Sequence, residues 1–247
     1  RMASEGVQAV AIIGVFSSVD PTQEQIAAKI IEQETPHMRI SMSHEIGRVG
    51  LLERENATIL NACLSRVSES AVGAFKLAIE DLGLSSSLFL SQNDGTLMDA
   101  EFAIKYPVLA ISSGPTNSMR GASFLTGIHD AIVADIGGTS TDVGILRNGF
   151  PRESSIAVDI GGVRTNFRMP DVLSIPLGGG SLVKTSPLVI GPDSVAMHLM
   201  EQSLVFGGSI MTTTDIAVAA GMADIGQKSL VSKISRTDVN EALKVMH

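Results

Sequence analysis

The stretch with the clearest chemical potential is IVADIGGTSTDVGIL, Ile132 to Leu146, where two aspartates bracket two glycines and three hydroxyl residues. Glycines let backbone N–H groups approach phosphate oxygens without a Cβ in the way, and hydroxyls add donors. Carboxylates at the two ends could hold Mg²⁺ or orient an attacking water. The alternative is a plain hairpin that satisfies its own turn. The full pattern after a buried strand favours phosphate binding by the turn residues Gly137, Gly138, Thr139, Ser140 and Thr141. The two acids, Asp135 and Asp142, are the candidate metal ligands and catalytic groups.

This pattern differs from the common nucleotide fingerprints. Its glycine spacing matches neither the dinucleotide-binding motif nor the P-loop, and no lysine or helix follows it. A second glycine loop comes downstream and consists of Gly178, Gly179, Gly180 and Ser181. Three successive glycines allow very close approach by a nucleotide or by another chain segment, and a flexible connector is an equally simple alternative. The position after the first loop favours a role near a ligand.

A near-copy of the first motif follows it, IAVDIGGVRTNF from Ile156 to Phe167. Superposing the copies puts Val163 at Thr139, and Asn166 at the closing acid, Asp142. The near-copy has therefore lost the closing acid and the hydroxyl at the position of Thr139, and has gained Arg164. We expect it to be a neighbouring turn of the same antiparallel meander, with a similar backbone conformation and no role in metal binding.

The histidines offer one candidate. None of the five has the spacing of a zinc helix motif. His44, followed by Glu45, comes directly after an expected strand, where active-site residues often lie in α/β sheets. A surface or turn histidine is the plainer alternative.

Composition excludes several classes of partner. The net charge of −8 and an aromatic content of 4% argue against nucleic acid and anionic membrane surfaces. The apolar run Val7 to Phe16 reaches about half the length of a membrane span. The single cysteine, Cys63, excludes an internal disulfide framework and favours a reducing cytoplasm.

The elements that must position these residues are those of an α/β protein with a mixed sheet. Val7 to Phe16 and Met38 to Met42 are expected strands joined by a helix, and this βαβ unit predicts a partly parallel sheet. The segment Asn56 to Leu82 is an expected helix that buries Ile59, Cys63 and Val67. We also expect a strand at Val108 to Ile111, an Asn148-Gly149 hairpin turn leading to a strand at Ser155 to Val158, and helices at Pro192 to Gln202 and Asp215 to Ala220.

The Asp135–Asp142 hairpin resembles a phosphate loop of the actin, Hsp70 and sugar-kinase superfamily. More narrowly, the order of motifs along nearly the whole chain resembles the hydantoinase A/5-oxoprolinase family. Those motifs are Ser43-His44-Glu45-Ile46, Leu60-Asn61-Ala62, Ser91 to Met98, Ser112 to Pro115, Asp135 to Val143, Gly178 to Ser181 and Thr214-Asp215.

The resemblance implies two actin-like, ribonuclease H-like lobes around a nucleotide cleft, with residues 1–130 ending the first lobe and 131–247 beginning the second. It implies ATP with Mg²⁺ or Mn²⁺, a lactam or cyclic imide substrate whose carbonyl ATP activates, and a hydantoinase B-like partner subunit or domain. On this basis His44 joins Asp135 and Asp142 as a candidate catalytic residue. The alternatives are a subunit of an ATP-dependent ketone carboxylase and a nucleotide-binding subunit without ring chemistry.

Three departures from the family pattern indicate a divergent branch. The family's first-lobe phosphate loop has no counterpart here, so we expect an N-terminally truncated fragment that is inactive alone. Leu173 stands where many members have a histidine before the triple glycine. The segment Gly191 to Ala196 also differs from the family's corresponding turn.

Overall fold

The computed structural model describes residues 5–154 and 158–246 of the chain, which divides into two compact units. Unit 1 comprises Arg1–Ala131 together with Ile145–Asp171, and unit 2 comprises Ile132–Gly144 together with Val172–His247. Within the described residues, no helix is both long enough and apolar enough to cross a membrane. The assignment of residues 1–130 and 131–247 to separate lobes stays a prediction.

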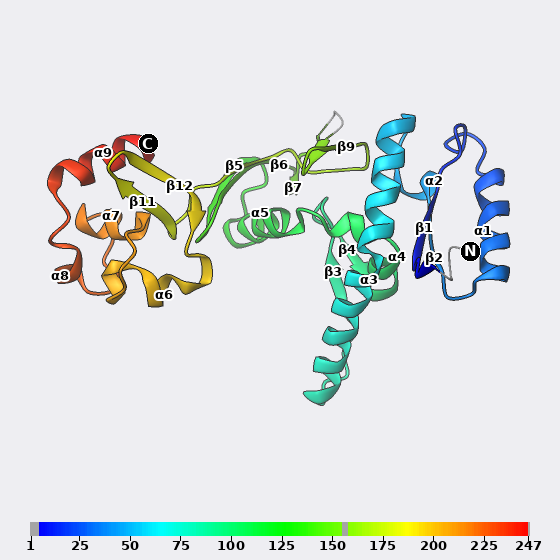
Figure 1. The fold of residues 1–247 in the computed structure, drawn as a ribbon, viewed down its shortest axis with the longest axis horizontal. Helices are drawn as coiled ribbons and strands as arrows, with labels where there is room; N and C mark the ends of the chain where they lie inside the picture. The colour runs from blue at the N-terminus through cyan, green and yellow to red at the C-terminus, as the bar shows by residue number, and fades with distance from the viewer. Residues whose placement is uncertain (1–4, 155–157, 247) are drawn as a thin grey trace. The chain divides into compact units, whose positions relative to one another are not determined.

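Unit 1 begins with the expected βαβ unit. Strand β1 (Ala9–Ile12) pairs in parallel with β2 (Arg39–Met42), and helix α1 (Thr22–Glu34) joins them. The two strands lie between α1 and the long helix α3 (Leu51–Asp81), as Figure 1 shows. A parallel pair with helices on both faces is the usual arrangement of such a unit, and the prediction is confirmed.

Helix α3 buries a different face from the one expected. The apolar residues Ile59 and Val67 are exposed, and so is Cys63. The buried residues near the helix's start are small or polar: Ala57, Thr58, Asn61, Ala62 and Ser65. Small side chains let the helix approach β1 and β2 closely, while the Asn61 amide donates to the Lys105 carbonyl at 3.0 Å. The prediction that Ile59, Cys63 and Val67 form the buried face is therefore wrong.

The rest of unit 1 up to Ala131 is a hairpin and short helices. The hairpin pairs β3 (Phe89–Ser91) with β4 (Leu97–Asp99), and the helices are α2 (Ser43–Ile46), α4 (Ala100–Lys105) and α5 (Ser113–Thr126). The prediction of a strand at Val108 to Ile111 is wrong, because Pro107–Ala110 forms a 3₁₀ helix, η2. Pro107 sits at the start of this helix, where no N–H is needed, and the Val108 N–H donates to Asn61 Oδ1 at 3.2 Å. Val108 is thereby buried in one cluster with Ala57, Phe167 and Met169.

The segment 145–171 of unit 1 contains two turns of the expected kind. Asn148 and Gly149 have φ of 50° and 76°, which confirms the tight turn between β6 (Thr141–Arg147) and β7 (Phe150–Pro151). The near-copy motif forms its own hairpin, β8 (Val158–Ile160) with β9 (Val163–Thr165). Of the strand expected at Ser155 to Val158, residues 155–157 lie outside the described residues.

The near-copy hairpin is a packing element of unit 1. The Asn56 side chain on α3 donates to the Arg164 carbonyl at 2.9 Å, and the Arg164 guanidinium lies 3.4 Å from Glu53. Its glycines, Gly161 and Gly162, have φ of 59° and 84°. The first copy shows no positive φ at its two glycines, and β8 and β9 form a sheet separate from that of β5 and β6. The prediction that the two copies are turns of one meander with a similar backbone conformation is therefore wrong.

Unit 2 carries the first glycine motif between β5 (Ala131–Ile136) and β6, with β10 (Val172–Ile175) antiparallel to β6 on its other side. A second hairpin, β11 (Ser181–Thr185) with β12 (Leu188–Ser194), packs on α7 (Thr213–Ala219) and α9 (Arg236–Met246) (Figure 1). Its core contains Val183, Ile216, Val239 and Ala242. A neighbouring cluster of Val205, Val218 and Val231 includes the short helix α8 (Lys228–Val231).

The helix expected at Pro192 to Gln202 is correct only in its second half. Pro192 to Ser194 belong to β12, where Ser194 pairs with Ser181, and the Val195 N–H donates to the Gly180 carbonyl at 2.9 Å. Short helical turns follow at η3 (Ala196–His198), α6 (Leu199–Gln202) and η4 (Leu204–Phe206). The expected helix at Asp215 to Ala220 is confirmed as α7.

Candidate functional site

The two glycine loops of unit 2 are hydrogen-bonded to each other. The Gly179 N–H donates to the Gly137 carbonyl at 3.0 Å, and the Gly180 N–H donates to the Gly138 carbonyl at 2.6 Å. The Thr141 hydroxyl, at the end of the first turn, donates to the Leu177 carbonyl at 2.6 Å. The turn between β5 and β6 therefore rests on the triple-glycine loop.

Two of the three glycines, Gly178 and Gly180, are required by this backbone contact. A Cβ on Gly178 would lie 2.6 Å from the Gly137 carbonyl oxygen and 2.7 Å from the Thr139 nitrogen. A Cβ on Gly180 would lie 2.9 Å from the Gly138 carbonyl oxygen. Backbone atoms cannot give way as a flexible side chain can. Of the alternatives that the sequence left open, close approach by another chain segment accounts for these glycines.

The donors that remain for an anion are in the first turn. In the second loop the Gly178 N–H is already bound to the Ser181 hydroxyl at 2.9 Å. In the first turn the Gly137 N–H binds the Ser140 carbonyl at 2.9 Å. The N–H groups of Gly138, Thr139 and Ser140, and the hydroxyls of Thr139 and Ser140, have no hydrogen-bond partner among the described residues. Successive free N–H groups of this kind form a concavity that suits a phosphate.

The two aspartates stand at the ends of this turn and differ in their surroundings. Asp142 accepts a hydrogen bond from the Ser174 hydroxyl on β10, whereas the Asp135 carboxylate has no partner in the described part of the chain. No cluster of three or more His, Cys, Asp or Glu side chains suited to a metal occurs within residues 5–154 and 158–246. The role of the two carboxylates as Mg²⁺ ligands stays a prediction; this ion is usually bound through one or two carboxylates together with phosphate oxygens and water.

Helix α7 fixes the second loop from the other side. The Thr213 hydroxyl donates to the Gly178 carbonyl at 2.5 Å, and Thr214 donates to the Gly179 carbonyl from its N–H at 3.0 Å and its hydroxyl at 2.8 Å. The carbonyls of Gly178 and Gly179 are thus engaged by the first turn of one helix.

Asp215 secures that helix and is fully buried. Its carboxylate accepts from the Thr212 N–H at 2.7 Å, the Thr212 hydroxyl at 2.9 Å, and the N–H groups of Val205 at 2.7 Å and Leu204 at 3.3 Å. The sequence identified Thr214-Asp215 only as part of a motif. The signal for its role was the pattern Thr212-x-x-Asp215, which is that of a helix capping box.

A cavity of about 350 Å³ opens beside the two loops, all within unit 2. Its walls are mainly apolar, and both loops contribute to it. The residues that line it are Ile136, Thr141, Ile175, Leu177, Gly178, Gly179, Thr213, Thr214, Ala217 and Met246. A concave, mainly apolar cavity next to a few polar groups is typical of small-molecule sites.

His44 belongs to unit 1, where it pairs with a glutamate that the sequence did not single out. Its Nδ1 lies 2.6 Å from Glu24 Oε2, and the Glu24 side chain is only 1% exposed. Burial raises the pKa of Glu24, but hydrogen bonds from Ser43, His44 and the Gly14 N–H outweigh it and lower the pKa to about 2. No local motif connects the two residues, because the contact is made by the packing of α1 against the end of β2.

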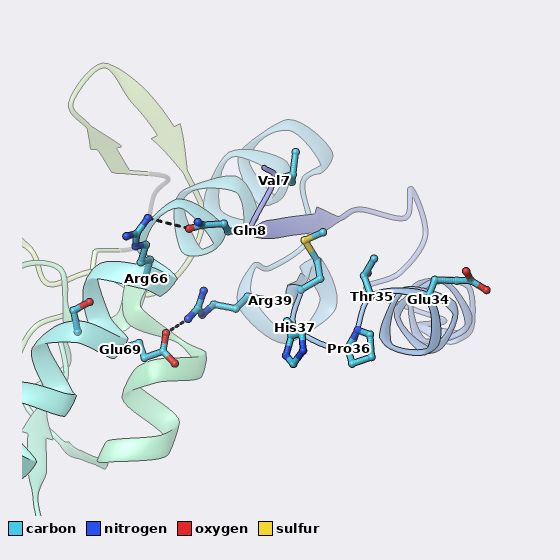
Figure 2. A pocket seen from close by; sticks show the side chains of 11 residues that line it. Val7, Gln8, Glu34, Thr35, Pro36, His37, Arg39, Arg66 and Glu69 are labelled. Carbon is cyan, nitrogen blue, oxygen red and sulfur yellow. Dashed lines mark hydrogen bonds and ion pairs between the residues drawn. The ribbon is translucent and has the colours of Figure 1, made fainter. Parts of the chain in front are cut away.

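A second cavity, of about 670 Å³, lies in unit 1 and contains none of the predicted site residues. It lies between the start of β1, the connection from α1 to β2, and α3 (Figure 2). Its two arginines have partners, since Arg39 forms an ion pair with Glu69 and Arg66 donates to the Gln8 side chain at 3.2 Å. The glycine loops therefore remain the better candidate for anion binding.

Comparison with known proteins gives a consistent result. The family model described as hydantoinase/oxoprolinase matches residues 54–239. The alpha subunit of caprolactamase from Pseudomonas jessenii is 29% identical over 87% of this chain and 32% of that protein. The gamma subunit of acetophenone carboxylase from Aromatoleum aromaticum is 25% identical over 89% of this chain and 32% of that protein. The chain thus spans about a third of the length of these relatives.

Solved structures agree with the sequence comparison. The crystal structure of the ATP-dependent caprolactamase from Pseudomonas jessenii matches 99% of the chain and 36% of its own, with a TM-score of 0.73 and 26% identity. Nucleotide-free acetone carboxylase matches 98% of the chain and 37% of its own, with a TM-score of 0.66 and 18% identity, which bears on the fold alone. The expected α/β fold of actin-like ATPase lobes, present in part, is confirmed by these matches.

Proposed function

The chain belongs to the hydantoinase/oxoprolinase family, and on this premise we propose that the intact protein uses ATP to open a lactam or cyclic imide ring. The observation that carries the proposal is the turn between β5 and β6, where the N–H groups of Gly138, Thr139 and Ser140, unpartnered within residues 5–154 and 158–246, lie between Asp135 and Asp142. The ring-opening chemistry rests on the similarity to the ATP-dependent caprolactamase.

In this proposal the first turn holds the phosphates of ATP. Gly137, Gly138, Thr139, Ser140 and Thr141 form the binding turn, while Asp135 and Asp142 hold Mg²⁺ or Mn²⁺ or orient water. The metal, when bound, neutralises charge on the transferring phosphoryl group. The loop Gly178 to Ser181 supports the turn and borders the nucleotide, whose base suits the apolar cavity beside it.

ATP is needed because an amide carbonyl is a poor electrophile. Transfer of the γ-phosphoryl group to the lactam oxygen releases ADP and makes the ring carbon open to attack by water. Loss of the ring nitrogen as an amine then opens the ring, and a second water releases phosphate. The chain contributes positioning and charge stabilisation, which are the main sources of rate in phosphoryl transfer.

Two further functions are supported by particular observations. Similarity to the acetophenone carboxylase gamma subunit extends over 89% of the chain, which supports a ketone carboxylase subunit. Leu173, where many family members have histidine, is exposed on β10 opposite Val143, next to the pair formed by Ser174 and Asp142. Its apolar side chain there supports a nucleotide-binding subunit without ring chemistry.

The test is ADP release by the full-length protein, together with any partner subunit that copurifies. Caprolactam, hydantoin and 5-oxoproline are supplied in one series, and acetone or acetophenone with bicarbonate in another. We expect stimulation by a cyclic amide. Stimulation only by ketone with bicarbonate supports the carboxylase, and nucleotide binding without either supports the third function. The 247-residue chain alone is expected to hydrolyse ATP negligibly.

A further inference from the structure

A third cavity, of about 550 Å³, lies within unit 2 between the end of α7 and the helices α8 and α9. Its volume is within the range of small-molecule sites. The lining contains two cationic residues, one serine, one asparagine and six apolar residues, and no acidic residue. None of these residues lines the cavity beside the glycine loops, so the two cavities are separate.

The apolar part of this lining is fixed by the core of unit 2. Val231 on α8 is 1% exposed and packs with Val205 and Val218. Val239 on α9 is 7% exposed and belongs to the other core cluster of the unit. The floor of the cavity is therefore preformed, and an apolar ligand body that covers it is removed from water.

Lys228 on α8 and Arg236 at the start of α9 bring positive charge to the cavity. Both are exposed, and neither side chain forms an ion pair or a hydrogen bond with any residue that the structure describes. The cavity of unit 1 differs in this respect, because its arginines are held by Glu69 and Gln8. The guanidinium and ammonium groups in unit 2 are thus available to an anionic ligand.

The acidic residues of α9 do not compensate these charges. The four lining residues of this helix, from Arg236 to Leu243, recur at helical spacing and share one face. Asp238 and Glu241 do not line the cavity. Asp238 is instead engaged at the start of the helix, where its carboxylate accepts from the Ser235 hydroxyl at 2.7 Å.

We propose that this cavity binds a small organic carboxylate, whose charge pairs with Arg236 and Lys228 and whose apolar body lies on the floor formed by Val231 and Val239. A planar guanidinium matches the two oxygens of a carboxylate. The site favours a carboxylate over a phosphate, because its donors are side-chain cations and not successive backbone N–H groups like those of the turn between β5 and β6. The proposal does not depend on the ring-opening chemistry proposed above.

Isothermal titration calorimetry of the full-length protein with hexanoate tests the ligand class. Hexanamide has the same chain without the charge, and acetate has the charge without the chain. We expect saturable binding of hexanoate, with hexanamide and acetate each at least about tenfold weaker. Equal binding of hexanamide overturns the proposal, and so does the absence of saturable hexanoate binding, which is the result if another segment of the intact protein fills the cavity. Tighter binding of hexyl phosphate than of hexanoate overturns the choice of a carboxylate.

Arg236→Gln and Lys228→Gln locate the site. Both side chains are exposed, so we expect the variants to fold, which thermal unfolding checks. Each should weaken hexanoate binding about tenfold, because each removes one charged partner of the carboxylate. Lys244→Gln is the matched control, since it removes a positive charge from the same helix outside the lining and should leave the affinity unchanged. Hexanoate binding that neither cavity variant weakens, or that all three variants weaken equally, contradicts the assignment to this cavity.

Discussion

The Gly179 N–H donates to the Gly137 carbonyl oxygen at 3.0 Å, which joins the two glycine loops of unit 2 into one backbone structure. The two loops use their backbone N–H groups differently. The second loop uses the N–H groups of Gly179 and Gly180 to hold the first loop, whose own N–H groups at Gly138, Thr139 and Ser140 have no partner in the part of the chain that the structure describes. The anion site therefore depends on residues that do not themselves offer donors to the anion.

Gly178→Ala tests this dependence. The added methyl group meets backbone atoms of Gly137 and Thr139, so we expect a loss of about 1–3 kcal/mol in the free energy of unfolding. Gly138→Ala is the matched control for stability, since a Cβ there has nothing within 4 Å. Urea denaturation of both variants makes the comparison. Equal midpoints for the two variants contradict the close packing of the loops.

Asp215→Ala is expected to destabilise unit 2 by at least about 2 kcal/mol, because it leaves the buried donors of Thr212, Val205 and Leu204 without an acceptor. Asp224→Ala removes an exposed carboxylate of the same unit and should change little. Thermal unfolding followed by circular dichroism measures both. A small effect at Asp215 is incompatible with its role as the anchor of α7.

Asp142→Asn, in the full-length protein, should lower ATP turnover about 10²-fold and raise the Mg²⁺ concentration needed for half-maximal rate. The physical reason is the loss of a negative charge at the turn that holds the phosphates. Asp193→Asn, an exposed residue of β12, is the control. An unchanged Mg²⁺ dependence in Asp142→Asn removes this residue from the metal site.

Glu24 should make stability depend on pH in the acid range. Its pKa is lowered from 4.5 to about 2 in the folded chain, so its stabilising contribution is full above pH 4.5 and is lost as pH falls toward 2. We expect the free energy of unfolding of the wild type to fall more steeply over this range than that of Glu24→Gln. Urea denaturation midpoints of both proteins at several pH values measure the difference. If stability falls with pH equally in the wild type and in Glu24→Gln, the prediction is contradicted.

The parts of the molecule that could be predicted from sequence are those fixed by local pattern. The βαβ unit, the Asn148-Gly149 turn and α7 follow from periodicity and turn chemistry. The sequence predicted a role near a ligand for Gly178 to Ser181, but the direct contact of this loop with the first could not be predicted, because it depends on backbone approach between distant segments.

The errors have a common physical cause. Helix α3 packs through small and polar residues such as Ala57 and Asn61, so hydrophobic periodicity indicated the wrong face. At η2 an apolar run after Pro107 was expected as a strand, but the N–H of Val108 is satisfied by the Asn61 side chain. Glu24 was missed for the same reason, since its partner His44 meets it only through tertiary packing.

The most direct test of the central claim is the ratio of ADP formed to rings opened by the full-length protein, measured by chromatography of both products with caprolactam, hydantoin and 5-oxoproline in turn. The proposed mechanism predicts one ADP for each ring opened with at least one of these compounds, and loss of both products together in Asp142→Asn. ADP formation that no cyclic amide affects, or ring opening that proceeds without ATP, contradicts it.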